Sequence, residues 1–194
     1  MNYSMNRAVF LDRDGVINRK PPEGQYVTRW EEMQFLPEVP EAIALLARAG
    51  YCVFVVSNQR CVAKGLLTQG ELESIHQRMC QELADAGAVI TKAYYCPHEK
   101  QPPCSCRKPA PGMLLTAAQT HELDLASSWM IGDSDIDVEA GRSAGCKTVR
   151  IVKGYKVGNG GADLFAQSLL SAAREILQLD SAILSRCREF RCQR

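Results

Sequence analysis

The sequence of 194 residues contains no apolar stretch approaching the ~20 residues that a membrane-spanning helix needs. Its first residues, MNYSMNR, lead into the first apolar run without the long hydrophobic segment of a signal peptide, so we expect a cytoplasmic protein. Charge is almost balanced, at a net +1, and aromatic residues make up only 7%. A basic face with exposed aromatics is therefore not indicated, which argues against a nucleic-acid-binding module.

The composition is that of an ordinary globular protein, with 46% hydrophobic and 23% charged residues. The length predicts one domain, which we place at residues 1–180. The remaining residues, 181–194, include the stretch SRCREFRCQR and are expected to form a flexible basic tail. Because no long apolar face is left after the core is built, we expect a monomer.

Five apolar runs read as buried strands, and helical patterns lie between them. Most runs are continuous rather than alternating, as expected for parallel strands covered on both faces. The expected strands are 8–12, 51–57, 88–95, 128–133 and 146–152, and the expected helices are 38–49, 68–86, 111–122, 135–144 and 168 to about 179. This alternation predicts an α/β fold with an open, Rossmann-like parallel sheet, helices on both faces, and ligands at the carboxyl ends of the strands.

Two carboxylates, Asp12 and Asp14, follow the first apolar run in the stretch VFLDRDGVIN. Two such charges persist in a folded protein if a cation lies between them, or if one stays protonated for acid–base work. The alternative is an acidic turn in which one Asp caps the following segment. Gly15 would let the chain turn sharply away from the strand.

Polar residues also follow the other strands that should end at this edge. Ser57 and Asn58 end the second strand and are candidates for binding a phosphate oxygen, although a polar turn would look similar. Arg107 and Lys108 precede a helix start and could supply a fixed cation or form a solvated surface pair. The fourth strand ends at Asp133, followed by Asp135 and Asp137, which could also cap the next helix.

The loop CPHEKQPPCSC carries four potential metal ligands: Cys96, His98, Cys104 and Cys106. Three thiolates and one imidazole suit tetrahedral Zn²⁺, and the lack of an open position favours a structural site over a catalytic one. Metal binding would staple a proline-rich loop that has little apolar content to bury. The alternative is a loop that collects cysteines by chance. All of the six other cysteines except Cys61 are assigned no function: Cys52, Cys80, Cys146, Cys187 and Cys192.

The four segments DRDGV, VVSN, RKPAPG and GDSDID, in this order and strand context, resemble the four motifs of the haloacid dehalogenase (HAD) superfamily of phosphohydrolases. The resemblance covers residues 8 to about 150. It implies that Asp12 is the nucleophile, forming an aspartyl-phosphate, and that Asp14 is the general acid and base. It further implies Mg²⁺ held by the carboxylates of Asp12 and Asp133 and by the backbone carbonyl of Asp14.

The same resemblance gives roles to the neighbouring polar residues. Ser57 would bond a phosphoryl oxygen, Asn58 is a further phosphate contact, and Lys108 would stabilise charge on the transferred group. Asp137 would orient Lys108 or support the metal site.

The zinc loop followed directly by CRKP, together with DRDGVIN, resembles a branch of the superfamily that has no large cap domain. This branch contains phosphatases that remove the 7-phosphate of D-glycero-D-manno-heptose 1,7-bisphosphate, and it shares its zinc loop with histidinol-phosphate phosphatases. The resemblance implies a phosphorylated sugar as substrate, Arg107 as a contact to its second phosphate or hydroxyls, and residues 18–27 as a pocket wall.

The chain departs from this branch at two places. Arg60 and Cys61 stand where a pair of small residues is common, and Ser134 stands where many relatives carry a lysine or arginine that holds the substrate's phosphate. Arg60, Lys64 or Lys153 could compensate for the missing basic residue. The substrate therefore depends on residues outside the acidic pair, and a histidinol-phosphate phosphatase or another small sugar-phosphate phosphatase stays an alternative.

Overall fold

The computed structural model describes residues 6–152, 154 and 161–192 and is organised around one six-stranded parallel sheet. Across the sheet the strands lie in the order β3-β2-β1-β4-β5-β6. Their bounds are Arg7–Leu11 (β1), Tyr51–Asn58 (β2), Lys92–Cys96 (β3), Trp129–Gly132 (β4), Lys147–Ile151 (β5) and Leu164–Ala166 (β6). The predicted fold class, an open parallel α/β sheet, is confirmed.

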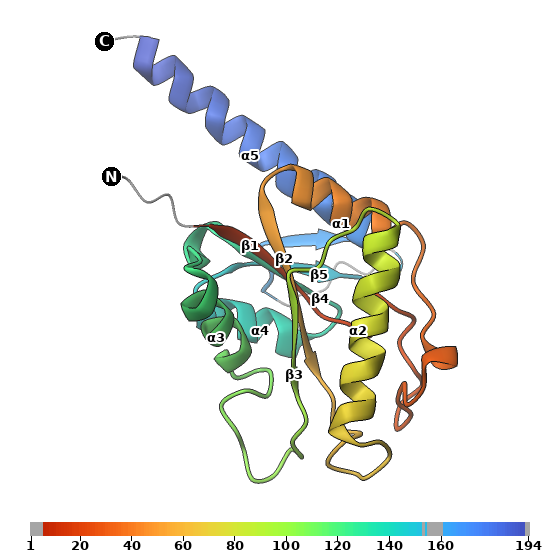
Figure 1. Ribbon diagram of the computed structural model, residues 1–194. Coiled ribbons are helices and arrows are strands. Elements are labelled where there is room, and N and C mark those ends of the chain that lie inside the picture. Colours follow the sequence, from red (N-terminus) through yellow and green to blue (C-terminus); the bar gives the residue numbers. More distant parts are fainter. Residues whose placement is uncertain (1–5, 153, 155–160, 193–194) are drawn as a thin grey trace.

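Helices cover both faces of the sheet (Figure 1). One face is covered by α1 (Val39–Arg48), α2 (Gln69–Asp85) and α5 (Leu169–Cys192), and the other by α3 (Gly112–His121) and α4 (Asp135–Ala144). Two short 3-10 helices, η1 (Trp30–Glu32) and η2 (Leu125–Ser127), lie in the connections. Among the described residues no further domain is inserted as a cap, as the sequence predicts.

Strand β1 shows how the sheet divides the core. Val9 and Leu11 face the α1, α2 and α5 side, whereas Ala8 and Phe10 face the α3 and α4 side. All four side chains are fully buried. Burial on both faces is the reason that the run is continuously apolar rather than alternating.

The strand ends bring the candidate site residues together. β1 lies between β2 and β4, with Leu11 paired to Val55 and Ile131. Because all three strands run in the same direction, Asp12, Ser57 and Asp133 emerge at one edge of the sheet.

Several helix boundaries follow the sequence signals. Thr68 and Glu71 form the capping box that starts α2, and Gly145, in the left-handed region with φ 87°, ends α4. Ser134 and Asp137 form a second capping box at the start of α4.

The sequence-based boundaries are wrong at three elements. Residues 88–91 precede β3 rather than belong to it: Ala88 donates its N–H to Leu83 O at the end of α2, so the apolar character of this stretch reflects packing beneath that helix. β6 has only three residues, too few for a periodic pattern. α5 does not stop near Leu179 but continues to Cys192, into the segment expected as a tail; the division into a domain and a tail stays a prediction.

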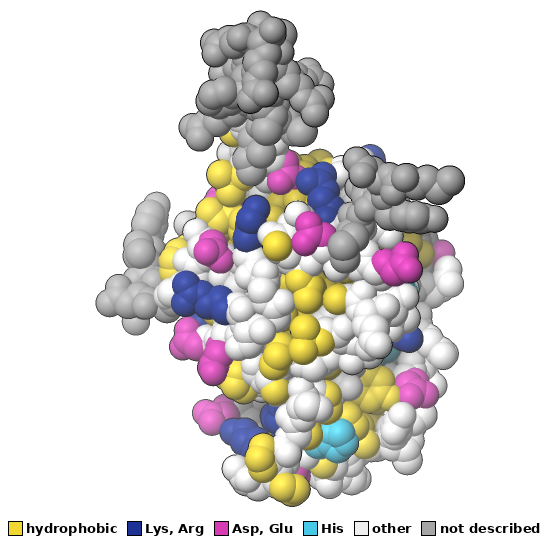
Figure 2. Space-filling view, turned by 90° about the vertical axis from the view of Figure 1, so that its left-hand side faces the viewer, with side chains coloured by type: hydrophobic (Ala, Val, Ile, Leu, Met, Phe, Trp, Pro, Cys, Tyr) yellow, Lys and Arg dark blue, Asp and Glu magenta, His cyan; other side chains and the backbone are white. Residues whose placement is uncertain are grey.

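One face of the molecule shows lysines and arginines interspersed with acidic side chains among its described residues (Figure 2). No continuous basic strip is visible on that face. Among the described helices, none combines the length and the apolar character required to cross a bilayer.

Candidate active site

Lys108 is the centre of a buried group of charges at the carboxyl ends of the strands. Its Nζ lies 2.8 Å from Asp12 Oδ1 and 2.7 Å from Asp137 Oδ1, and it donates to Val56 O at 2.7 Å. Lys108 is only 2% exposed. A buried ammonium is costly unless it is paired and hydrogen-bonded, and here three oxygens satisfy its three donors.

These contacts set the charge of both partners. Burial alone would lower the pKa of Lys108, but the two carboxylates outweigh it and raise this pKa to about 12. Burial raises the pKa of Asp12 to about 7, against the charge of Lys108 and with added repulsion from Asp137 and Asp14. A further cation beside Asp12 would favour the ionised carboxylate that a nucleophile requires.

The carboxylate oxygens of Asp12, Asp133 and Asp137 lie within 4.8 Å of one another and could hold such a cation. Oxygen ligands of this type are those that Mg²⁺ prefers. Asp133 also accepts from Lys20 Nζ at 2.7 and 2.9 Å. The sequence predicts Asp12 and Asp133 in this group but gives Asp137 a supporting role; Asp137 contributes an oxygen to the same group while it pairs with Lys108.

Two glycines make this close approach possible. Gly15 has φ 100°, and a Cβ placed there would lie 2.3 Å from Asp133 Oδ2. A Cβ on Gly132 would lie 2.1 Å from the Cβ of Asp137. Larger residues at either position would displace the carboxylates.

Asp14 is held apart from this group by its own set of donors. Arg13 donates to the Asp14 carboxylate from Nε at 3.2 Å and from Nη2 at 3.0 Å, Asn18 Nδ2 donates at 2.9 Å, and Gln59 Nε2 donates at 3.1 Å. Burial favours a higher pKa for Asp14, but the charge of Arg13 and these hydrogen bonds prevail and lower it. The side chain stays 23% exposed, so one side of the carboxylate remains accessible.

Ser57 and Asn58 have different surroundings. Ser57 is 1% exposed, and its Oγ accepts from Gln59 Nε2 at 2.7 Å. The Asn58 amide bonds both backbone groups of Lys108, at 3.0 Å to its N–H and 2.9 Å to its carbonyl. These bonds make Asn58 an anchor of the Lys108 segment, and its expected phosphate contact stays a prediction.

The four zinc-ligand candidates converge. Cys96 Sγ lies 3.6 Å from His98 Nδ1 and 3.5 Å from Cys104 Sγ. Cys106 Sγ lies 3.3 Å from His98 Nδ1 and 3.5 Å from Cys104 Sγ. Metal bonds of ~2.0–2.3 Å in a tetrahedron require ligand separations of about 3.5 Å, so the cluster fits Zn²⁺. Cys96 is the last residue of β3, which joins the cluster to the sheet.

Two of the residues expected to contribute to specificity, Arg107 and Arg60, contact the loop that carries the zinc-ligand candidates. Arg107 Nη1 donates to His98 O at 3.1 Å, and Arg60 Nε lies 3.1 Å from Glu99 Oε1. Lys64 Nζ lies 5.3 Å from the centre of the Tyr26 ring, and Lys153 falls outside the described residues. Ser134, where a basic residue was noted as missing, accepts and donates within the α4 capping box.

Sequence reasoning missed Arg13, Asn18, Gln59 and Lys20. Their roles depend on contacts to Asp14 and Asp133 that are set by the turn after β1 and by the neighbouring strand end. The only available signal was position: each lies within a few residues of a residue that was singled out, and both Asn18 and Lys20 lie in the segment expected to wall the pocket, residues 18–27.

The parallel sheet, the Asp12–Lys108–Asp137 group and the carboxylate cluster at the strand ends define a phosphatase of the HAD type. A family model described as "HAD-hyrolase-like" matches residues 105–159. The chain is 37% identical to the D-glycero-beta-D-manno-heptose-1,7-bisphosphate 7-phosphatase of Rhodopseudomonas palustris over 170 residues, covering 84% of this chain and 89% of the relative. Identity to the enzyme of the same name from Pseudomonas aeruginosa is 38%, over 79% of this chain and 85% of that one.

Solved structures agree with these relatives. The D,D-heptose 1,7-bisphosphate phosphatase of B. bronchiseptica, complexed with magnesium and phosphate, superposes with a TM-score of 0.79 and 33% identity, covering 89% of this chain and 98% of that one. A putative HAD-like phosphatase from Mesorhizobium loti gives 0.76 and 30%, covering 89% and 88%. The chain belongs to the D-glycero-manno-heptose-1,7-bisphosphate 7-phosphatase family of HAD-like phosphatases.

Proposed function

We propose that the protein is a magnesium-dependent phosphomonoesterase that removes the 7-phosphate of D-glycero-D-manno-heptose 1,7-bisphosphate. The observation that carries the proposal is the identity of 37% with a phosphatase of this name over 84% of the chain. The Asp12–Lys108–Asp137 group supports it, because it provides a carboxylate and a fixed cation at one point of the strand edge.

In the first half-reaction, an oxygen of Asp12 attacks phosphorus in line with the leaving sugar oxygen. The new bond joins phosphorus to Asp12, and the bond from phosphorus to the sugar oxygen breaks. Asp14 must be protonated for this step, although its donors lower its pKa in the free protein; the nearby phosphate dianion favours the protonated form. Asp14 donates this proton to the leaving oxygen, so the sugar leaves as an alcohol.

In the second half-reaction, a water molecule attacks the phosphorus of the aspartyl-phosphate. Asp14, now ionised, takes the proton of the water, and the bond from phosphorus to Asp12 breaks to release inorganic phosphate. Lys108 and Ser57 bind the phosphoryl oxygens and offset their growing charge in both steps.

Mg²⁺ held by Asp12 and Asp133, together with the backbone carbonyl of Asp14, would offset the repulsion between the phosphate dianion and the attacking carboxylate. The Zn²⁺ of the Cys96, His98, Cys104 and Cys106 cluster is assigned a structural role, holding the loop that carries Arg107. We assign Arg107 to the second phosphate or to sugar hydroxyls. The three free thiols of this cluster suit a reducing compartment, and the cytoplasm is the proposed location.

The test is a substrate comparison with the purified protein in Mg²⁺. Rates of phosphate release are measured for heptose 1,7-bisphosphate as each anomer, fructose 1,6-bisphosphate and histidinol phosphate. We expect the highest kcat/KM for the heptose bisphosphate, with heptose 1-phosphate as product. A preference for histidinol phosphate would establish the alternative substrate, and a lack of Mg²⁺-dependent release from all of them would refute the proposal.

A further inference from the structure

Arg13 lies between Asp12 and Asp14 in the sequence and is fully buried. Its Nε and Nη2 donate to Asp14, as described above, while its Nη1 lies 3.1 Å from Nε2 of His76. His76 belongs to α2 and is 4% exposed. One side of the guanidinium thus hydrogen-bonds to Asp14, and the other side hydrogen-bonds to His76 on α2.

The chemistry of the two groups fixes the direction of this bond. Arginine has only donors, so Nη1 donates and His76 Nε2 accepts, which places the imidazole proton on Nδ1. This arrangement requires a neutral ring. Burial, together with the charge of Arg13, lowers the pKa of His76 to about 3, so the ring remains an acceptor at neutral pH.

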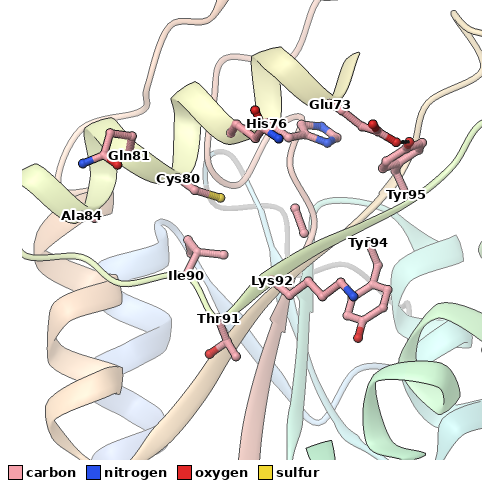
Figure 3. Close-up of a pocket in the computed structure, with 12 residues that line it drawn as sticks. Glu73, His76, Cys80, Gln81, Ala84, Ile90, Thr91, Lys92, Tyr94 and Tyr95 are labelled. Carbon is pink, nitrogen blue, oxygen red and sulfur yellow. Dashed lines mark hydrogen bonds between the residues drawn. The ribbon is translucent and has the colours of Figure 1, made fainter. Parts of the chain in front are cut away.

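The imidazole is itself held in place. The Tyr95 ring of β3 packs on it with a centroid separation of 5.5 Å, and the Tyr95 hydroxyl donates to Glu73 Oε1 at 2.6 Å. Figure 3 shows His76, Glu73 and Tyr95 together at one end of the groove between α2 and β3. A continuous set of contacts therefore runs from this groove through Arg13 to Asp14.

We propose that His76 is a positioning residue for the reaction: it fixes Arg13 and, through it, the orientation of the Asp14 carboxylate relative to the leaving oxygen. This inference rests on the proposed function, because it assigns His76 to the proton-transfer step. Two N–H groups of one planar guanidinium reach one carboxylate and restrict its rotation. Loss of the acceptor on the far side leaves a buried N–H unpaired, which favours a shifted guanidinium and a shifted carboxylate.

The inference predicts a loss that depends on the leaving group. An alkyl phosphate needs a proton at the departing oxygen, whereas 4-nitrophenyl phosphate releases a stable phenolate without one. His76→Leu removes the acceptor and keeps a side chain of similar size. We expect kcat/KM for the sugar phosphate to fall by roughly 10-fold, a part of the 10²–10⁴ that general acid catalysis supplies. kcat/KM for the aryl ester should change by less than about 2-fold, because this quantity excludes the later water attack, in which Asp14 is the base for both substrates.

Two further variants control for packing. His76→Gln places an amide oxygen near the position of Nε2 and should restore most of the sugar-phosphate rate. Tyr95→Phe removes only the hydroxyl that bonds Glu73, keeps the ring against His76, and should leave both rates unchanged. Thermal unfolding of each variant shows whether the fold is retained.

The ratio of the sugar-phosphate to the aryl-phosphate kcat/KM decides the outcome. An unchanged ratio in a folded His76→Leu protein, or an equal fall in both rates that His76→Gln does not restore, would overturn the inference. If His76→Leu does not fold, the ratio in His76→Gln and His76→Asn decides instead, since only the longer amide reaches Arg13. Failure of the proposed function can be told apart from failure of this inference, because wild-type protein would then not hydrolyse the heptose bisphosphate. In that case, any other alkyl phosphate that the protein hydrolyses can be used to measure the ratio.

Discussion

The part of the chain that the structure describes contains two clusters of metal-ligating side chains, and they are built in opposite ways. The carboxylate cluster takes its residues from the ends of separate strands and from α4, which the sheet brings to one edge. The Cys/His cluster takes all four ligands from residues 96–106, which begin at the last residue of β3 and continue as a proline-rich loop. The first is assembled by the core, whereas the second has little but its own ligands to hold it.

The two clusters also differ in whether positively charged side chains already pair with their ligands. Within the carboxylate cluster, Lys108 and Lys20 already pair with Asp12 and Asp133. In the Cys/His cluster, the short contacts run among the four ligands themselves. The fold should thus survive loss of the catalytic metal, while the loop should depend on zinc.

The largest expected effect is that of Asp12→Asn on activity. The amide cannot act as a nucleophile, so turnover should fall by roughly 10⁴-fold or more. Lys108 keeps Asp137 and Val56 O as partners, so the fold should be retained. Phosphate release and thermal unfolding measure the two quantities, and an active Asp12→Asn protein would contradict the nucleophile assignment.

Lys108→Met should affect both activity and stability. It removes the cation that faces the phosphoryl group, with an expected loss of about 10²–10³ in kcat. It also leaves Asp12 and Asp137 close together without their shared partner, which should cost about 3–5 kcal/mol in the free energy of unfolding. Denaturant titration checks this value. Lys20→Met is the matched control for stability: its side chain is 51% exposed, and the expected cost is ~0–1 kcal/mol.

Cys104→Ala should act on the loop rather than on the sheet. We expect loss of bound zinc, a Tm lower by roughly 5 °C, corresponding to ~2 kcal/mol, and reduced activity, because a disordered loop misplaces Arg107 and Lys108. Far-ultraviolet circular dichroism should stay close to wild type. Cys80→Ala, at a partly buried cysteine on α2 outside the cluster, should retain zinc and activity. Wild-type protein without zinc and with full activity would refute the structural role.

A smaller effect concerns pH and the buried His76. In the unfolded chain its pKa is ~6.5, whereas in the folded protein it is about 3, so between these values the unfolded state binds the additional proton. This residue therefore lowers stability as pH falls below about 6.5. Relative to His76→Gln, wild-type protein should lose at most about 2 kcal/mol between pH 7 and pH 5. The free energy of unfolding is measured by denaturant titration at each pH. An equal dependence of this free energy on pH in the two proteins would contradict burial of a neutral ring.

The residues that could be predicted from the sequence are those whose position along the chain fixes their place in space. Asp12 and Asp133 directly follow apolar runs, so the ends of parallel strands bring them together. The zinc ligands are local, and their spacing alone indicates the site. The family motifs then gave Lys108, which lies on a loop that no strand end fixes.

Other features depend on contacts that one-dimensional patterns do not carry. Arginine is rarely buried, so the sequence does not indicate that Arg13 lies in the interior. Its buried partner, His76, lies 63 positions away along the chain. β6 is too short for a period, and α5 runs on through a charged segment beyond the part that packs on α1. Ser134 and Asp137 form the capping box at the start of α4, which explains why a short polar side chain serves at position 134.

The central claim is that Asp12 carries the phosphoryl group between the two half-reactions. Its most direct test is acid quenching of the protein during turnover of its sugar-phosphate substrate in Mg²⁺, followed by mass spectrometry of the peptide that contains residues 9–18. The account predicts an added phosphoryl group on Asp12, lost on further incubation before quenching and not found in Asp12→Asn. Phosphorylation at another residue, or full turnover by the Asp12→Asn protein, would contradict it.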